Sequence, residues 1–196
     1  MPLAGTYMEY GFIFDMDGVI INSNPYHKIA WETFLRNHGI PVDDHFFDQV
    51  LSGRTGPSSL RMIFGEDLSP DLLEEYLLEV DEGYQGILRK SEENLAIAGI
   101  YEFLDSIRKR GHRLALATSA PELNIELGLA KLGLEDVFEV IVGKVDVSVG
   151  KPHPEVYLTT LERLGLPGEN CVVFEDSFAG IQSALAAGIP VVGIAS

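Results

Sequence analysis

Two carboxylates interrupt an apolar run near the start of the chain, Phe12-Ile13-Phe14-Asp15-Met16-Asp17-Gly18-Val19-Ile20. The apolar residues before Asp15 predict a buried β-strand. Because side chains alternate between the faces of a strand, Asp15 and Asp17 would share one side if the extended geometry continues to Gly18. Two buried anions repel each other, so the pair favours the carboxyl end of a strand, where a cation such as Mg²⁺ can balance the charge. For this stretch alone, a solvated Asp-Gly turn is the alternative.

Length and composition indicate a compact globular protein. The chain has 196 residues, of which 46% are apolar, and this is enough for a buried core with an inserted domain. Its 30 acidic and 14 basic residues give a formal charge of −16, which repels nucleic acids and anionic membrane surfaces. An anionic substrate would therefore need a local cluster of Lys, Arg or backbone N–H groups.

We expect a cytoplasmic protein. The chain has no run of about 18 apolar residues and no basic segment followed by an apolar one at its start, so neither a membrane span nor a signal peptide is indicated. The single cysteine, Cys171, lies in an apolar run, which favours a small core residue over a nucleophile. We expect a monomer, with a dimer as the alternative.

The stretch after the first motif has the apolar spacing of helices. Helices are predicted over residues 25–38 and 58–64, and a long one begins at Ser69-Pro70, where a capping Ser and a first-turn Pro precede a continuous apolar face. We therefore predict an all-helical domain over residues 23–92.

From residue 98 onward, helices alternate with strands. After the first strand at 10–16, strands are predicted at 113–118, 138–142, 171–175 and 191–194. Alternating units of this kind indicate parallel strands joined by right-handed crossovers. We predict an α/β fold in which residues 1–22 and 93–196 form a doubly wound, Rossmann-like parallel sheet, with the helical domain inserted between them. Because the chain stops on a strand, we expect one face of the sheet to be thinly covered.

Polar residues follow the predicted strands repeatedly, as Asp15 and Asp17, Thr118-Ser119, Lys151-Pro152 and Glu175-Asp176. Sites in open α/β sheets form beyond the carboxyl ends of the strands, so one cleft would collect four acids, two hydroxyls and a lysine. Each has a separate structural explanation, such as a helix cap or a solvated loop charge. Their combination favours a functional site.

Four motifs occur in a fixed order: Asp-Met-Asp-Gly at 15–18, Thr118 after an apolar strand, Gly-Lys-Pro-His-Pro at 150–154, and Phe-Glu-Asp-Ser-Phe-Ala-Gly-Ile at 174–181. With these motifs the chain resembles the haloacid dehalogenase-like superfamily over most of its length. The branch concerned contains β-phosphoglucomutase and small phosphosugar phosphatases. In this resemblance the helical domain corresponds to the family's cap domain.

The resemblance implies phosphoryl transfer through an aspartyl-phosphate. Asp15 would be the nucleophile, and Asp17 would give a proton to the leaving alcohol and then take one from water. Thr118, the backbone of Ser119 and Lys151 would bind the phosphoryl oxygens.

The resemblance also implies a Mg²⁺ site. The ligands would be the side chain of Asp15, the backbone carbonyl of Asp17, and the side chains of Glu175 and Asp176, all of them the oxygen donors that this cation prefers. Dehalogenation needs neither Mg²⁺ nor a general acid, so the three acids beyond Asp15 argue against it.

Cap residues would choose the substrate. Gly53, Arg54 and Thr55 lie in the predicted cap loop, and His27 on the first cap helix is either a polar cleft residue or an aid to proton transfer.

A mutase must hold a second phosphate. The mutase of this branch does so with an Arg in the cap loop and a Ser-Lys-Asn run after the second motif; the matching positions here are Gly56 and Ala120-Pro121-Glu122. Glu122 would repel that phosphate. We therefore favour a phosphatase of small phosphorylated metabolites, in particular sugar phosphates, with a sugar-phosphate mutase and a non-catalytic sensor of such metabolites as the alternatives.

Overall fold

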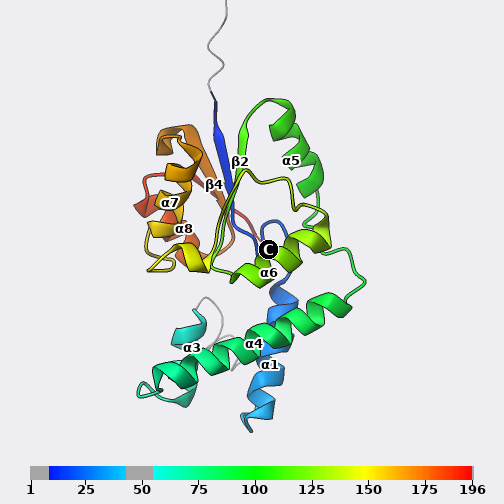
Figure 1. Ribbon diagram of the computed structural model, residues 1–196, viewed down its shortest axis with the longest axis vertical. Coiled ribbons are helices and arrows are strands. Elements are labelled where there is room, and N and C mark those ends of the chain that lie inside the picture. The colour runs from blue at the N-terminus through cyan, green and yellow to red at the C-terminus, as the bar shows by residue number, and fades with distance from the viewer. Residues whose placement is uncertain (1–8, 43–54, 196) are drawn as a thin grey trace, which may run out of the picture. The chain divides into compact units, whose positions relative to one another are not determined.

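The computed structural model describes residues 9–42 and 55–195 (Figure 1). The chain forms two compact units, one of Met1–Asn22 with Asn94–Ser196 and one of Ser23–Glu93. The first contains the strands, and the described elements of the second are all helices.

The first unit is built on a five-stranded parallel sheet with the strand order β3-β2-β1-β4-β5. The strands are β1 (Gly11–Phe14), β2 (Arg113–Ala117), β3 (Val140–Val142), β4 (Cys171–Glu175) and β5 (Val191–Gly193). The strand of the first motif is central, with Ile13 paired to Ala115 on one side and to Val173 on the other. This arrangement confirms the predicted doubly wound α/β fold.

Helices cover both faces of the sheet (Figure 1). They are α5 (Ile100–Lys109), α6 (Glu122–Leu132), α7 (Glu155–Leu164) and α8 (Phe178–Ala186). Because side chains alternate along β1, its two faces have different partners. Ile13 packs with buried residues of α7 and α8, whereas Phe12 and Phe14 contact Phe103 of α5.

One side of the sheet packs against mainly aliphatic side chains, and the other side packs against aromatic rings. Phe14 stacks on Phe174 of β4 with ring centroids 4.7 Å apart. Cys171 is buried in the opposite cluster, as predicted for a small core residue. At the edge of the sheet, Val192 of β5 is exposed.

The first motif leaves the sheet earlier than predicted. Strand β1 ends at Phe14, although the Asp15 N–H still donates to the carbonyl of Phe174 at 3.0 Å. The chain then turns, because Gly18 N donates to Ile21 O and Gly18 adopts a φ of 73°. The condition for placing Asp15 and Asp17 on one strand face, extended backbone as far as Gly18, is therefore not met. Asp17 lies in a turn that is stabilised by local hydrogen bonds and by glycine's tolerance of positive φ.

The second unit contains three described helices, α1 (Asn24–Asn37), α3 (Gly56–Phe64) and α4 (Pro70–Lys90). Its core is formed by Phe34, Leu35, Leu60 and Val80, with Trp31 packed against them. Ser69 caps α4 by accepting a hydrogen bond from Leu72 N, as its position before Pro70 predicts. Among the described helices, none has the length and apolar character needed to cross a membrane.

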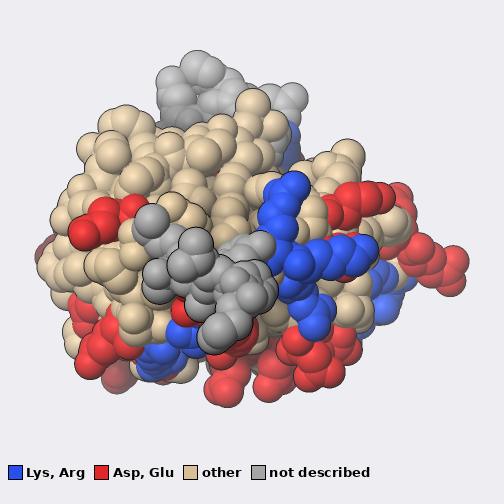
Figure 2. Space-filling model, turned by 90° about the horizontal axis from the view of Figure 1, so that it is seen from above, with Lys and Arg blue, Asp and Glu red and all other residues tan. Residues whose placement is uncertain are grey.

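Acidic side chains dominate the protein's charge, but basic ones gather locally. The face shown in Figure 2 carries a group of Lys and Arg side chains among many Asp and Glu. In the sequence, Arg108, Lys109 and Arg110 fall together at the end of α5, where cations interact favourably with the helix dipole.

Candidate active site

The site forms where β1, β2 and β4 end, and Lys151 connects these ends. Its ammonium donates to Asp15 Oδ1 at 2.8 Å, to Glu175 Oε1 at 2.5 Å and to the carbonyl of Ala117 at 3.1 Å. Lys151 and Asp15 are each 8% exposed, and Glu175 is fully buried. All three protons of the ammonium are therefore used inside the protein, between two carboxylates far apart in the sequence.

Glu175 is held by four hydrogen bonds. Oε1 accepts from Lys151 and from the Tyr157 hydroxyl at 2.9 Å, and Oε2 accepts from the N–H and hydroxyl of Ser177 at 3.0 and 2.9 Å. Burial by itself would raise the pKa of Glu175, but Lys151 and Ser177 outweigh it and lower the pKa. Glu175 is thus an ionised carboxylate in a fixed orientation.

Asp15 has excess negative charge around it. The pKa of Asp15 is raised to about 7, chiefly by burial, against the lowering effect of Lys151, and the carboxylates of Glu175 and Asp17 add to the increase. Burial opposes the charge on Lys151, but Asp15 and Glu175 raise its pKa, so it stays protonated. One ammonium does not neutralise this cluster, and a further cation would favour the ionised form of Asp15.

A metal ion fits the same cluster. Asp15, Glu175 and Asp176 each offer a carboxylate oxygen, and the three oxygens lie within 4.8 Å of one another. A donor set made only of oxygen suits Mg²⁺. At Glu175, whose two oxygens already accept four hydrogen bonds, a metal ion would share an oxygen with one of these donors or replace it.

Thr118 and Ser119 follow β2 at the same edge of the sheet. Thr118 is buried, its N–H donates to Val142 O at 3.0 Å, and its Oγ1 accepts from Ala120 N at 3.1 Å. Ser119 is exposed, and Asp17 in the turn after β1 is half-buried. The structure thus places the polar core residues predicted from the sequence at one edge of the sheet.

Two of the residues predicted to bind substrate lie in the helical unit and have local partners there. His27 stacks on the buried Tyr84, with ring centroids 3.9 Å apart and an interplanar angle of 3°. Thr55 caps α3 by accepting from Ser58 N at 3.4 Å. Gly53 and Arg54 lie outside the described residues.

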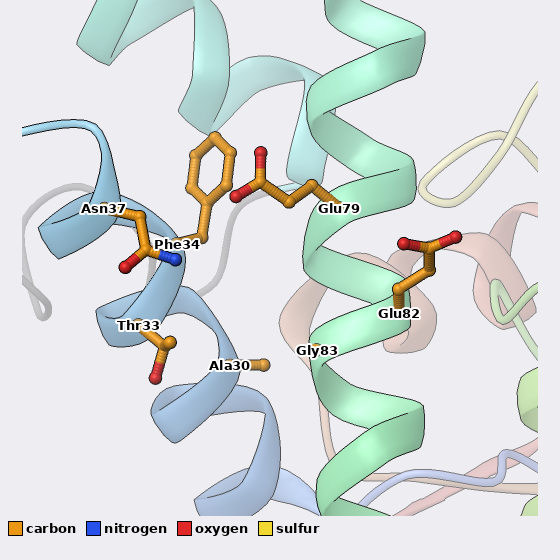
Figure 3. A pocket seen from close by; sticks show the side chains of 7 residues that line it. All are labelled: Ala30, Thr33, Phe34, Asn37, Glu79, Glu82 and Gly83. Atoms are coloured by element: carbon orange, nitrogen blue, oxygen red, sulfur yellow. The ribbon is translucent and has the colours of Figure 1, made fainter.

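A separate hollow of about 290 Å³ lies between α1 and α4 (Figure 3). Its described lining contains Phe34, Asn37, Glu79 and Glu82 and includes no Lys or Arg. The two carboxylates in its lining repel phosphate, so this hollow is unsuited to a phosphorylated ligand.

The loop that carries Lys151 is braced from α7. Glu155 accepts from Ser148 N at 2.8 Å and from Val149 N at 2.9 Å. Asp146 accepts from Gly143 N at 2.8 Å and pairs with Arg163 at 2.5 Å. The Lys151–Pro152 peptide bond is cis. These contacts fix both sides of the loop before Lys151 enters the site.

Sequence reasoning missed two residues that touch Glu175. Tyr157 is fully buried in the apolar face of α7, and a Tyr in such a position usually has a partner for its hydroxyl; the sequence does not reveal which one. Gly180 lies where an added Cβ would be 1.8 Å from Glu175 Oε1. Its place at the start of α8 gave no sign of that contact.

Comparisons with known proteins agree with this geometry. The haloacid dehalogenase-like hydrolase family matches residues 12–194, and the chain belongs to that family. It is 34% identical to a phosphorylated carbohydrates phosphatase of Thermotoga maritima, over 90% of this chain and 81% of the relative. It is 32% identical to the fructose-1-phosphate phosphatase YqaB of Escherichia coli, over 96% of this chain and 98% of the relative.

A solved structure shares the fold. The crystal structure of β-phosphoglucomutase from Clostridium difficile superposes with a TM-score of 0.82 at 29% identity, covering 95% of this chain and 84% of the other. Named relatives thus include both phosphatases and a mutase.

Gly180→Ala should displace Glu175, because the new Cβ would occupy the space of its carboxylate. We expect activity to fall at least about tenfold, the scale on which residues supporting a metal site act. Steady-state kinetics measures the loss. Gly86→Ala, in α4 with open space around the position, serves as the control. Full activity in Gly180→Ala would contradict the fixed position of Glu175.

Asp146→Asn should change the acid stability of the protein. The hydrogen bond from Gly143 N, followed by Arg163, lowers the pKa of Asp146 below its ordinary 3.8. The ionised Asp146 carboxylate therefore makes its full contribution to the free energy of unfolding above the unfolded-state pKa. This contribution is lost as pH falls through the lower folded-state pKa. Urea unfolding across pH should show a gap between wild type and variant that closes below pH 3.8.

The exposed Asp136→Asn is the control for that series. A gap that stayed constant from neutral pH to the acid limit would show that the Asp146 charge does not stabilise the Lys151 loop.

Proposed function

We propose that the protein is a Mg²⁺-dependent phosphatase of small phosphorylated metabolites, with sugar phosphates as its substrate class. The observation that carries the proposal is the buried contact of Lys151 with Asp15 and Glu175, beside Asp176, in a haloacid dehalogenase-like hydrolase. The phosphatase names of the two relatives support the substrate class.

Asp15 would carry out the first step. A carboxylate oxygen of Asp15 forms a bond to phosphorus while the bond to the sugar oxygen breaks, and the leaving oxygen takes a proton from Asp17. Water then gives a proton to Asp17 and attacks the same phosphorus, which releases inorganic phosphate and restores Asp15. Two displacements replace one difficult hydrolysis.

The phosphoryl oxygens need donors that the acidic surface does not supply. We assign this task to the hydroxyl of Thr118, to the backbone N–H of Ser119 and to Lys151, all at the carboxyl edge of the sheet. One proton of the Lys151 ammonium would exchange its present acceptor for a phosphoryl oxygen. Because phosphoryl transfer depends mainly on positioning and charge neutralisation, the buried setting of Lys151 and Thr118 supports the assignment.

Mg²⁺ would be held by the side chains of Asp15, Glu175 and Asp176 and by the backbone carbonyl of Asp17. When bound, it would neutralise charge where an anionic carboxylate meets an anionic phosphate. The three carboxylate oxygens within 4.8 Å support this ligand set.

The helical unit would be the cap that selects the substrate, and Gly53, Arg54, Thr55 and His27 remain the proposed contacts. Its first and last turns are tied together, since the Tyr26 hydroxyl donates to Glu93 at 2.8 Å and lies 3.1 Å from Ser91 Oγ. Such a tie between its two chain crossings favours movement of the unit as one body. We further propose a monomeric, cytoplasmic enzyme, for which the acidic charge and the single buried cysteine are the support.

Mutase activity is the second candidate, because β-phosphoglucomutase shares the fold. It would require a cation for a second phosphate, whereas Glu122 occupies the first turn of α6 after the Thr118 loop. This carboxylate favours hydrolysis. A non-catalytic sensor would not need the ionised, fully bonded Glu175 next to Asp15.

We expect inorganic phosphate to be released from a sugar phosphate panel that includes fructose 1-phosphate, and we expect a chelator to abolish the release. Asp15→Asn should reduce the rate by about 10³-fold, which corresponds to about 4 kcal/mol in the barrier, because the amide cannot form the acyl phosphate. The exposed Asp136→Asn should keep wild-type activity.

Two results would contradict different parts of the proposal. Isomerised sugar phosphate without phosphate release would indicate the mutase. Unchanged turnover in Asp15→Asn would exclude the covalent route, whatever the substrate.

A further inference from the structure

Tyr157 contacts both charged partners of Asp15. Its hydroxyl donates to Glu175 Oε1 at 2.9 Å, and Lys151 Nζ lies 5.1 Å from the centroid of its ring. The side chain is fully buried. It comes from α7, the helix that also braces the loop of Lys151 through Glu155.

The hydroxyl is not needed for packing. The ring belongs to the apolar cluster between the sheet and α7, together with Val156 and Leu164, and phenylalanine would fill the same volume. Burying a hydroxyl costs free energy unless it forms a hydrogen bond. The hydroxyl of Tyr157 therefore has its effect at Glu175.

The geometry gives that hydroxyl a specific role. Oε1 of Glu175 accepts from Lys151 and Tyr157, while Oε2 accepts from the N–H and the hydroxyl of Ser177. Without Tyr157, Lys151 would be the sole donor to Oε1. Its ammonium would then be drawn toward Glu175 and away from Asp15, and the carboxylate could rotate about its bonds to Ser177.

We propose that Tyr157 is a positioning residue: its hydroxyl fixes the Glu175 carboxylate, and through it Lys151, in the arrangement that binds Mg²⁺ and the phosphoryl group. The inference rests on the proposed function and adds a residue to it. Tyr157 acts through Glu175 and does not itself touch substrate or metal.

Tyr157→Phe tests the proposal, because it removes the hydroxyl and keeps the ring. Mutating a residue that orients a metal ligand lowers the metal affinity by about 10- to 100-fold. We therefore expect the Kd for Mg²⁺, measured by calorimetry without substrate, to rise about tenfold. The Mg²⁺ concentration for half-maximal activity should rise equally.

Two comparisons separate positioning from general stability. Tyr101→Phe removes a hydroxyl that donates to Leu132 O at 3.1 Å in the same unit, and it should leave the Kd for Mg²⁺ unchanged. In a Glu175→Gln background, Tyr157→Phe should cause no further loss of Mg²⁺ affinity, since the two residues act as one.

A wild-type Kd for Mg²⁺ in Tyr157→Phe would overturn the inference, as would a lower Tm with no change in that Kd. An additional loss in the Glu175→Gln background would also overturn it. Calorimetry needs no substrate, so the inference can fail while phosphate release by the wild type still supports the proposed function. Equally, it can hold if no sugar phosphate is hydrolysed.

Discussion

The ammonium of Lys151, buried between the carboxylates of Asp15 and Glu175, is the contact on which the rest of the site depends. Three charges removed from water are stable only if each is paired and hydrogen-bonded, and here the three ammonium protons all have acceptors. The strand order makes this possible. Placing β1 between β2 and β4 brings Asp15, Ala117 and Glu175 to one edge, where a lysine from the loop after β3 can reach all of them.

Support for this contact comes from residues without catalytic chemistry. Ser177 holds one oxygen of Glu175 and caps α8 by accepting from Gly180 N. Gly180 lacks a side chain because Glu175 fills that space. Glu155 fixes the loop before Lys151 from the start of α7. The buried charge cluster thus explains the residues at the start of two helices: Ser177 and Gly180 accommodate Glu175, and Glu155 holds the loop of Lys151, although none of them contacts a ligand.

Much of this architecture could be predicted from the sequence, because strand periodicity and polar residues at strand ends are local signals. They placed Asp15, Thr118, Lys151 and Glu175 at one edge of a parallel sheet. The first strand was predicted to end at residue 16 but ends at Phe14, and the Asp-Gly turn was only an alternative, since strand length depends on pairing with neighbours that the pattern does not show. The bond between Tyr157 and Glu175 joins residues 18 positions apart through tertiary packing, which no spacing rule anticipates. Likewise, a polar loop residue such as Thr55 proved to be a helix cap.

The central claim is that this buried charge cluster makes Asp15 a nucleophile toward phosphorus. The most direct test is to quench the enzyme in acid during turnover of a sugar phosphate with Mg²⁺, reduce with borohydride, and analyse the peptides by mass spectrometry. An acyl phosphate is reduced to the alcohol, so the account predicts homoserine at position 15 and at no other Asp, and none in Asp15→Asn. Steady phosphate release with no reduced residue at position 15 would contradict it.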